Sequence, residues 1–506
     1  MTIIQKYVLN TLFFTAICIP IFLKLDMLPI QMWDEARNAI AAMEMMDNGD
    51  WFVRHYIGAV DTWETKPVLL IWLQILFFKL IGINELAVRL PSAFATFGIV
   101  IWIYRFFKNE LKNIEGGVFA SLALIVSDGF IRHHVSRTGD HDALLSFFLL
   151  WSFFEFYDFI KTNHTKSLIR FAIATSAAVL TKSIVGFLWL PGFFIYALFS
   201  KKVVLILKNQ NFYKAIAVII GIVGGYYGIC EYIHHGHFND VWRMELLPRY
   251  TNTDLNYKFT VLPDKWFYIK QITYEGHFFP LWQLLPMGLL VGFDAKNRDE
   301  KHLTYLIATV VSSFLLIISN GCANGWYDAP VYPLLAMLIG IGLSFFYKQL
   351  VARFSETPSF MRQILYGFCF LTFFFVLPYK KMFLSIYWVG EKDAAEKFGL
   401  LVPHLAKNRP EWREYTLAHD TYDAQFLFYI RTYNQKGYKL SGAMTANIEK
   451  DSLFLKDLKK EQKIVVFQPH VEKVLQSNYE IELLYTFEEY KLYRILNPKT
   501  QKVVWK

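Results

Sequence analysis

The sequence contains eleven apolar runs, each about long enough to cross a lipid bilayer as a helix. In the bilayer core no water can satisfy backbone N–H and C=O groups, so runs of this length fold there as helices. We therefore predict a mainly α fold, a polytopic transmembrane helical bundle of about 11 to 13 spans. The runs are residues 7–25, 86–107, 116–134, 142–160, 168–182, 184–200, 213–233, 278–294, 303–319, 329–347 and 362–379.

The composition agrees with a membrane protein, since 54% of the residues are hydrophobic and only 19% are charged. The net charge of +9 comes largely from Lys and Arg in short loops between the apolar runs. That distribution is typical of cytoplasmic loops and not of a nucleic-acid surface. We expect membrane lipids as surroundings, no nucleic acid partner and a monomeric chain. The first run, Tyr7 to Leu25, lacks a small-residue cleavage site after it, so we expect a retained anchor.

The segment Val68 to Ile83 is also apolar, and its placement decides which loops share one side of the membrane. If it crosses, the basic loop from Arg105 to Lys112 falls outside. If it lies along the outer interface as a short helix, the Lys- and Arg-rich loops all face the cytoplasm, as the positive-inside rule requires. We therefore predict the interfacial placement. The stretches left on the outer face are then residues 31–67, 136–142, 234–277 and 320–328, together with Lys182.

The predicted organisation has two domains. Residues 1–379 would form the transmembrane domain, with an outer loop carrying interfacial helices at 26–85 and a long outer loop at 234–277. Residues 380–506 are mixed, charged and free of spanning runs, so we predict a small soluble α/β domain on the outer, periplasmic face. Its predicted elements are a helix over 393–406 and strands over 414–418, 425–430, 463–467, 481–485 and 489–495.

The stretch Gln31 to Pro67 is crowded with ionisable residues, which membrane proteins carry sparingly near the bilayer. Carboxylates and cations held at a membrane surface suit a substrate with a phosphate and a hydroxyl or amine to be deprotonated. On spacing alone, a solvated outer loop explains the pattern equally well. The residues concerned are Asp34, Glu35, Arg37, Glu44, Asp47, Asp50, Arg54, Asp61, Glu64 and Lys66.

Two histidine-rich stretches raise the question of a divalent metal ion. His and carboxylate side chains suit zinc or manganese, and His133, His134, Asp140, His141 and Asp142 lie together. For His133 and His134 a solvated polar helix end is the better explanation. The group His234, His235 and His237 follows no fixed metal-site pattern, so a surface turn is favoured. We expect no firm cofactor, and the metal candidates are Glu64, His141 and Asp142.

Several motifs together resemble the C-type glycosyltransferases, in the branch that contains the protein O-mannosyltransferases and the bacterial lipid A aminoarabinose transferase. The resemblance covers roughly residues 7–345, and it is specific for the family and not for the substrate. In chain order the motifs are MWDEARNAIAAMEMMDNGDWFVRHYIGAVDTWETKPVLLIW, ELAVRLPSAF, RTGDHDALLSFF, LTKSIVGFLWLPGF, MELLPRYTN and WYDAPVYPLLAML.

The resemblance implies a polyprenyl-phosphate-linked sugar as donor and transfer to an acceptor on the outer membrane face. Asp34 would be the catalytic carboxylate, with Glu35 beside it and Asp142 at the acidic position of the second outer loop. Arg37 and Lys66 would hold the lipid phosphate, because cations stabilise the charge that grows on a leaving phosphate. Further donor-binding positions would be Lys182, Arg249 and Tyr327.

The sequence departs from the family pattern at two places. The family more often places Glu and Lys side by side before Pro, whereas here Thr65 separates Glu64 from Lys66, which leaves the role of Glu64 open. The branch often carries a Lys before the Trp-Tyr pair, and here the run is NGCANG. The loop 234–277 is also too short for the large extra domain of the eukaryotic protein-mannosylating members, which favours the bacterial type.

We therefore predict a glycosyltransferase of the bacterial inner membrane, with lipid A, a glycan or a protein as acceptor on the periplasmic face. One alternative is a transporter or flippase of lipid-linked sugars, which would need ionisable residues at mid-membrane depth. The central parts of the apolar runs are nearly free of such residues. A second alternative is a polymerase or ligase of surface polysaccharide. The sugar and the acceptor stay open.

Overall fold

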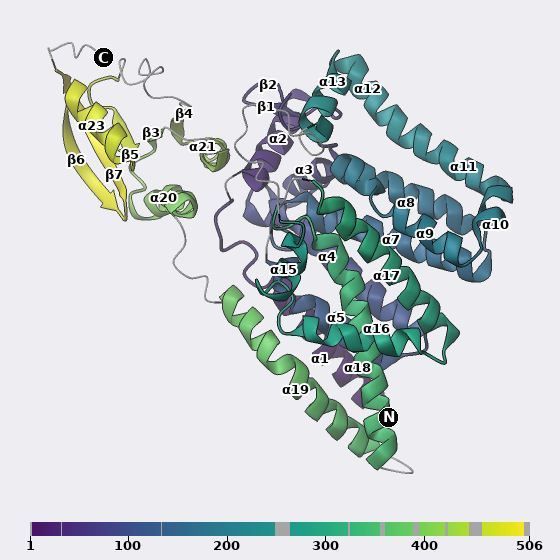
Figure 1. The fold of residues 1–506 in the computed structure, drawn as a ribbon. Coiled ribbons are helices and arrows are strands. Elements are labelled where there is room, and N and C mark those ends of the chain that lie inside the picture. Colours follow the sequence, from purple (N-terminus) through teal and green to yellow (C-terminus); the bar gives the residue numbers. More distant parts are fainter. Residues whose placement is uncertain are drawn as a thin grey trace. The chain divides into compact units, whose positions relative to one another are not determined.

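The chain forms two compact units (Figure 1). The membrane unit comprises Met1–Leu25, Glu44–Leu76 and Arg89–Trp388, and the sheet unit comprises Asp26–Met43, Phe77–Val88 and Val389–Lys506. The computed structural model describes residues 3–31, 33–132, 134–247, 264–321, 324–354, 360–387, 394–419, 424–444 and 458–499.

Among the described residues up to 387, most of the regular structure is helical. Its helices are α1 (Ile3–Phe22), α2 (Asp34–Asn48), α3 (Leu69–Ile81), α4 (Glu85–Asn109), α5 (Ile114–Ile125), α6 (Asp128–Ile131), α7 (His141–Thr162), α8 (Lys166–Lys182), α9 (Leu190–Phe199), α10 (Val203–Lys208), α11 (Gln210–Ile219), α12 (Gly225–Ile233), α13 (His237–Val241), α15 (Phe267–Thr273), α16 (Leu285–Phe293), α17 (Arg298–Ile318), α18 (Tyr332–Phe354) and α19 (Phe360–Tyr387). Short 3₁₀ or π segments are η1 (Ser183–Phe187), η2 (Ile220–Gly224), η3 (Trp242–Leu246), η4 (Leu281–Leu284) and η5 (Ala329–Val331), and the short strands β1 (His55–Tyr56) and β2 (Ala59–Val60) form a hairpin.

Seven helices among the described residues are long and apolar enough to cross a membrane. The chain is therefore a multi-pass membrane protein, as its apolar runs predict. The remaining four of the eleven predicted runs form shorter apolar helices of 10–17 residues. The segment predicted to be interfacial forms α3, a shorter apolar helix of 13 residues.

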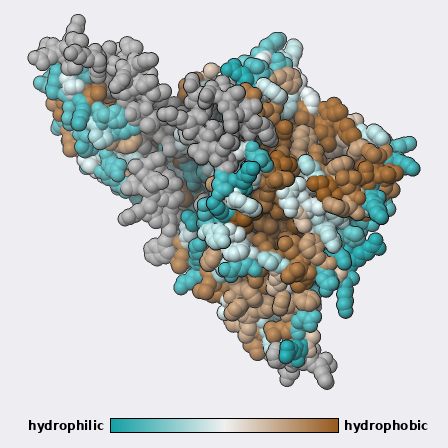
Figure 2. All heavy atoms as spheres, in the orientation of Figure 1, coloured by the Kyte–Doolittle hydropathy of each residue, from teal (hydrophilic) through white to brown (hydrophobic). Residues whose placement is uncertain are grey.

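The helices differ in how much of their surface the protein covers. The Ala329–Arg353 span is 89% buried, whereas Gln210–Ile233 is 11% buried and apolar. Uncovered apolar side chains of this kind suit contact with lipid. Figure 2 shows hydrophobic side chains gathered over the part of the membrane unit where α9 and α11 lie. Close packing around α18 depends on glycine, since a Cβ at Gly340 would lie 2.5 Å from the Gly116 carbonyl oxygen.

The sheet unit contains a five-stranded mixed sheet in the order β4-β3-β5-β7-β6. Strand β3 pairs in parallel with β4 and β5, and β7 pairs antiparallel with β5 and β6. Parallel neighbours need a crossover connection, which α21 provides between β3 and β4. The elements are α20 (Ala394–Asn408), β3 (Glu414–His419), α21 (Ala424–Asn434), β4 (Lys439–Met444), β5 (Lys463–Val466), α23 (Pro469–Asn478), β6 (Tyr479–Phe487) and β7 (Tyr490–Pro498).

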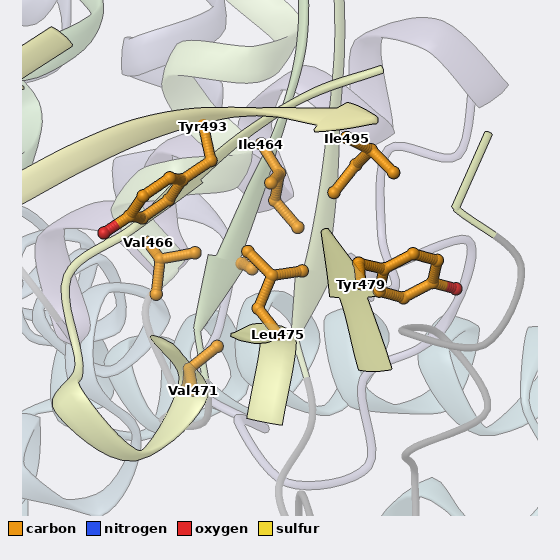
Figure 3. Packing of buried hydrophobic residues seen from close by; sticks show 8 residues of the cluster. Ile464, Val466, Val471, Leu475, Tyr479, Tyr493 and Ile495 are labelled. Atoms are coloured by element: carbon orange, nitrogen blue, oxygen red, sulfur yellow. The ribbon is translucent and has the colours of Figure 1, made fainter. Parts of the chain in front are cut away.

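The core of the sheet unit is a cluster of buried side chains between α23 and the sheet (Figure 3). Ile464 and Val466 of β5 face Leu475 of α23, and all three are nearly inaccessible to solvent. Elsewhere in this unit, the Tyr429 hydroxyl receives a hydrogen bond from the Ile30 backbone N–H at 3.0 Å and donates one to Glu85 at 2.8 Å. Three distant segments of sequence therefore belong to one packed body.

One predicted element of this unit is wrong. The run 425–430 was expected as a strand, but it lies inside the helix α21. A short apolar run can be a buried strand or a buried helix, and periodicity alone does not distinguish the two. Here Phe426, Tyr429 and Ile430 recur at helical spacing and are all buried. The predicted helix 393–406 and the strands near 414–418, 463–467, 481–485 and 489–495 are confirmed.

Candidate functional site

The centre of the candidate site is an ion pair between the adjacent helices α7 and α8. The Lys182 Nζ lies 2.6 Å from Asp142 Oδ1 and 2.7 Å from Oδ2. Both side chains are 4% exposed, so each charge depends on the other for compensation. Asp142 sits in the first turn of α7 and Lys182 ends α8, and both positions suit the helix dipoles.

The turn after Lys182 is unusually tight. Ser183 has a positive φ of 50°, and the segment η1 folds back onto α8. A Cβ at Gly186 would lie 2.4 Å from the backbone nitrogen of Val179, so a larger residue does not fit there without a shift of the backbone. The sequence around this glycine therefore fixes where α8 ends and where its lysine stands.

Tyr327 reaches the Asp142–Lys182 pair from a third segment of the chain. Its ring centroid lies 5.0 Å from Lys182 Nζ, a distance that suits a cation–π contact. Tyr327 belongs to the loop that precedes η5 and α18, and its side chain is half-buried. The structure thus brings together three predicted residues that are distant in sequence: Asp142, Lys182 and Tyr327.

A second pair, Glu64 and Lys66, lies in an ordered loop before α3. Lys66 Nζ donates a hydrogen bond to Glu64 Oε2 at 2.8 Å. Asp61 accepts hydrogen bonds from the backbone N–H groups of Trp63 and Glu64, which fixes the loop. Burial would raise the pKa of Glu64, but the charges of Lys66 and Arg54 oppose it and hold that pKa well below its usual range.

His141 connects the two pairs. It interacts electrostatically with Lys66 and Glu64 of the loop and with Lys182 of α8. Its side chain is buried, and no residue in the described part of the chain forms a hydrogen bond with its Nε2. The two pairs and Tyr327 therefore form one charged neighbourhood at the amino-terminal end of α7.

Three further predicted residues stand in the first turn of α2, within the sheet unit. Asp34 is half-buried, and Glu35 and Arg37 are buried. The Glu35 carboxylate accepts a hydrogen bond from the Gln31 backbone N–H at 2.7 Å. A carboxylate that bonds the backbone just before a helix stabilises the start of that helix. Glu35 therefore holds the segment that carries Asp34.

Two of the predicted residues cannot be placed. Arg249 and His133 lie outside the described residues, and so does the middle of the long loop 234–277. For the metal question, no group of three His, Cys, Asp or Glu side chains able to hold a metal ion occurs within the described ranges. Glu64 is engaged by Lys66 and Asp142 by Lys182, so a cation there would compete with a lysine.

Sequence reasoning did not single out several residues of this neighbourhood. Arg54 was one of ten charged residues in its stretch, yet it is buried and its charge acts on Glu64. Asp328 and His277, both buried, lie beside the loop of Tyr327. A signal for Asp328 was its place directly after Tyr327 in a recognised motif. No pattern in the sequence marked His277.

The fold and the site define a multi-pass membrane protein with a cluster of buried and half-buried charges at one end of its helices. Residues 65–225 match the sequence model of the dolichyl-phosphate-mannose-protein mannosyltransferases. Through this stretch the chain is similar to that family of glycosyltransferases.

Similar proteins include two named undecaprenyl phosphate-alpha-4-amino-4-deoxy-L-arabinose arabinosyl transferase. The one from Shewanella sediminis is 30% identical over 190 residues, which are 34% of this chain and 32% of the relative. The one from Aeromonas hydrophila subsp. hydrophila is 24% identical over 344 residues, 63% of this chain and 56% of the relative. The matches thus span less than two thirds of these relatives.

The fold as a whole is similar to a solved structure. ArnT from Cupriavidus metallidurans bound to undecaprenyl phosphate superimposes with a TM-score of 0.69 at 16% sequence identity. The alignment covers 96% of this chain and 97% of that protein. At this identity the likeness is one of fold.

Proposed function

We propose that this chain transfers a sugar from a polyprenyl-phosphate-linked donor to an acceptor at the membrane surface. The observation that carries the proposal is the placement of Lys182 between Asp142 and Tyr327, with the Glu64–Lys66 pair in the same electrostatic neighbourhood. The names of the relatives support the donor class, because the arabinosyl transferases are named for an undecaprenyl phosphate sugar. The acceptor is a lipid, a glycan or a protein.

The lysines would bind the phosphate, which is the leaving group of such a transfer. Charge grows on the phosphate as the bond to the sugar breaks, and fixed cations stabilise that charge. Lys182 and Lys66 each contact a carboxylate in the structure. These carboxylates compensate the lysines until a donor phosphate takes their place. Arg37 and Arg249 are further cations of the proposal, as the family resemblance implies.

The carboxylates divide into two roles. Asp34 would be the catalytic group, which orients or deprotonates the acceptor. Glu35 is buried and holds the start of α2, and Asp142 engages Lys182 through both of its oxygens. These two carboxylates support other groups and are poorly placed to act as the base themselves. Asp34 is the one of the three that is only half-buried.

The proposed topology has eleven crossings. The seven long helices cross, and so do the four shorter apolar helices Tyr7–Phe22, Ile114–Ile125, Leu190–Phe199 and Leu281–Phe293. Helix α3 then lies along the outer interface. With the amino terminus inside, the Lys- and Arg-rich loops face the cytoplasm. The candidate site and the carboxy-terminal domain that follows α19 would face the periplasm of a bacterial inner membrane.

The proposal is tested with purified protein and undecaprenyl phosphate that carries either mannose or 4-amino-4-deoxy-L-arabinose. Release of undecaprenyl phosphate in the presence of a membrane-lipid acceptor is the readout. We expect release by the native protein and loss of release in Asp34→Asn. Asp47→Asn is the matched control, because Asp47 is exposed in the last turn of the same helix α2. It should keep native activity and native thermal stability.

Two outcomes would contradict the proposal at different points. Full release by Asp34→Asn would remove Asp34 from the chemistry and leave the enzyme class standing. Movement of intact donor across vesicles, without release of undecaprenyl phosphate from any donor, would identify a transporter.

A further inference from the structure

Tyr327 is flanked in sequence by Trp326 and Asp328, and each of these neighbours contacts a histidine from a different loop. The proposed function gives Tyr327 a role beside Lys182 but does not use these histidines. Both contacts join segments that are far apart in sequence. They lie on the two sides of Tyr327, whose ring contacts Lys182 of the Lys182–Asp142 pair.

The first contact involves His134. Its ring stacks on the Trp326 ring, with centroids 4.2 Å apart and an angle of 28° between the planes. His134 Nδ1 lies 3.1 Å from Asp140 Oδ2, and Asp140 is buried two residues before Asp142. The imidazole therefore joins the loop of Tyr327 to the loop that leads into α7.

The second contact involves His277 and Tyr332. The Tyr332 hydroxyl donates a hydrogen bond to Asp328 Oδ2 at 2.8 Å, and His277 Nδ1 lies 3.2 Å from that hydroxyl and 3.8 Å from the carboxylate oxygen. All three side chains are buried. Burial raises the pKa of Asp328, and His277 and Tyr332 oppose that effect. The carboxyl therefore depends on these two partners.

The backbone of His277 is fixed in turn. Its N–H donates to the Gln271 carbonyl at 3.2 Å, and its carbonyl accepts from the Gly129 N–H at 3.0 Å. There is no room around this contact, since a Cβ at Gly129 would lie 2.6 Å from the Tyr332 hydroxyl oxygen. α15 and α6 thus fix the backbone of His277, while its side chain contacts the loop of Tyr327.

We infer that His134 and His277 are positioning residues that clamp the loop of Tyr327 from both sides and so hold its ring over Lys182. This inference rests on the proposed function, in which Lys182, held beside the Tyr327 ring, binds the donor phosphate. The clamp places the ring without contact to the substrate. Its loss lets Tyr327 leave Lys182 and weakens phosphate binding, because the contact needs a fixed loop.

The test measures the affinity of the full-length purified protein for undecaprenyl phosphate in detergent, so it needs no knowledge of the sugar. The variants are His277→Gln, His134→Gln and Tyr332→Phe, each alone and combined with Tyr327→Ala. Tyr332→Phe removes only the hydroxyl and keeps the ring packing. The matched control is His302→Gln, because His302 Nδ1 also lies close to a tyrosine hydroxyl, that of Tyr196, at 2.9 Å.

We expect each single clamp variant to raise the Kd about two- to tenfold, and to change it less than about twofold once Tyr327 is already Ala. This non-additivity distinguishes positioning through Tyr327 from a general structural role, which would cost the same in both backgrounds. His302→Gln should leave the Kd unchanged. Thermal unfolding of every variant shows whether the protein is folded in each measurement.

Two results would overturn the inference, and they differ from a failure of the proposed function. Equal losses of affinity with and without Tyr327, in protein that binds undecaprenyl phosphate normally, would reject the clamp alone. Native affinity in all three single variants would reject it too. Two results would reject the phosphate site itself, and with it the clamp. Either the native protein binds no undecaprenyl phosphate, or the Lys182→Met variant binds it with the same affinity as the native protein.

Discussion

Helix α7 carries an ion pair at each end, and the two pairs could hardly differ more. At the amino-terminal end, Asp142 meets Lys182 with both side chains 4% exposed. Near the other end, Lys161 lies 3.4 Å from Glu110 and 2.9 Å from Asp299, with side chains 30%, 49% and 31% exposed. One helix therefore presents the same chemistry in two very different environments.

The difference shows which of the two pairs requires an explanation beyond folding. An exposed pair costs little to form and contributes about 0–1 kcal/mol. A buried pair has a desolvation penalty that its attraction often fails to exceed, so well-packed apolar residues would serve stability equally well. The Asp142–Lys182 pair is therefore poorly explained by stability, and the proposed role in binding a charged substrate would account for its presence.

Among the variants that test the contrast between the two ion pairs of α7, we expect Lys182→Met to have the largest effect. The substitution leaves Asp142 buried without its cation, which should cost about 3–5 kcal/mol of unfolding free energy. If Lys182 also binds the donor phosphate, release of undecaprenyl phosphate should fall about a hundredfold or more. Thermal unfolding in detergent and the release assay measure the two effects on the same preparation.

The double variant Asp142→Asn/Lys182→Met separates the two effects. It removes both charges, so most of the lost stability should return while the activity stays low. Recovery of activity together with stability would show that the pair serves folding alone, and the contrast between the two ends of α7 would lose its functional meaning.

Glu64→Gln should have the next largest effect, and this effect should depend on pH. The variant removes the carboxylate that Lys66 contacts at 2.8 Å, and we expect a loss of about 1–3 kcal/mol at neutral pH. The pKa of Glu64 is lower in the folded protein than its usual 4.5, so its contribution is present above that value and is lost as the pH falls through the folded pKa.

Apparent Tm values of the native protein and Glu64→Gln, taken from neutral pH down to about pH 2, check this sign. The gap between the two proteins should narrow below the usual carboxyl pKa of 4.5, because the unfolded chain then binds a proton at Glu64 that the folded protein does not. A gap that widens on acidification would mean that Glu64 is not held in its charged form.

Gly186→Ala tests the turn that places Lys182. The new Cβ would lie 2.4 Å from the backbone nitrogen of Val179, so the backbone must shift, at a cost of about 1–3 kcal/mol. Gly221→Ala is the matched control, because nothing lies within 4 Å of its Cβ position, and it should change stability by less than about 1 kcal/mol. Equal Tm values for the two variants would contradict the role of the turn.

The sequence predicted much of this fold because apolar length is a strong signal. The long runs that contain α4, α7 and α18 correspond to helices able to span a membrane. The sheet unit was harder, since the run within α21 has the composition of a buried strand and a buried helix alike. Strand β4 was not predicted, because its residues KLSGAM lack a clear alternating pattern.

The sequence motifs named several residues of the candidate site but not the contacts between them. Asp142 and Lys182 were named from their motifs, yet their pairing depends on the packing of α7 against α8, which no local pattern encodes. The same holds for His277, which reaches the loop of Tyr327 only through tertiary structure. The roles assigned to the site residues stay predictions until the variants are measured.

Lys161→Gln should have the smallest effect on stability and activity, and it is the control for the comparison of the two ion pairs. The variant removes the cation at the other end of α7, where solvent compensates Glu110 and Asp299. We expect a change of about 0–1 kcal/mol, reduced further by added salt, because exposed pairs are screened. Release of undecaprenyl phosphate should be native, since Lys161 lies nearly the length of α7, about 29 Å, from Asp142. A loss of activity as large as that of Lys182→Met would show that both ends of α7 act on the reaction, and that burial is the wrong criterion for separating them.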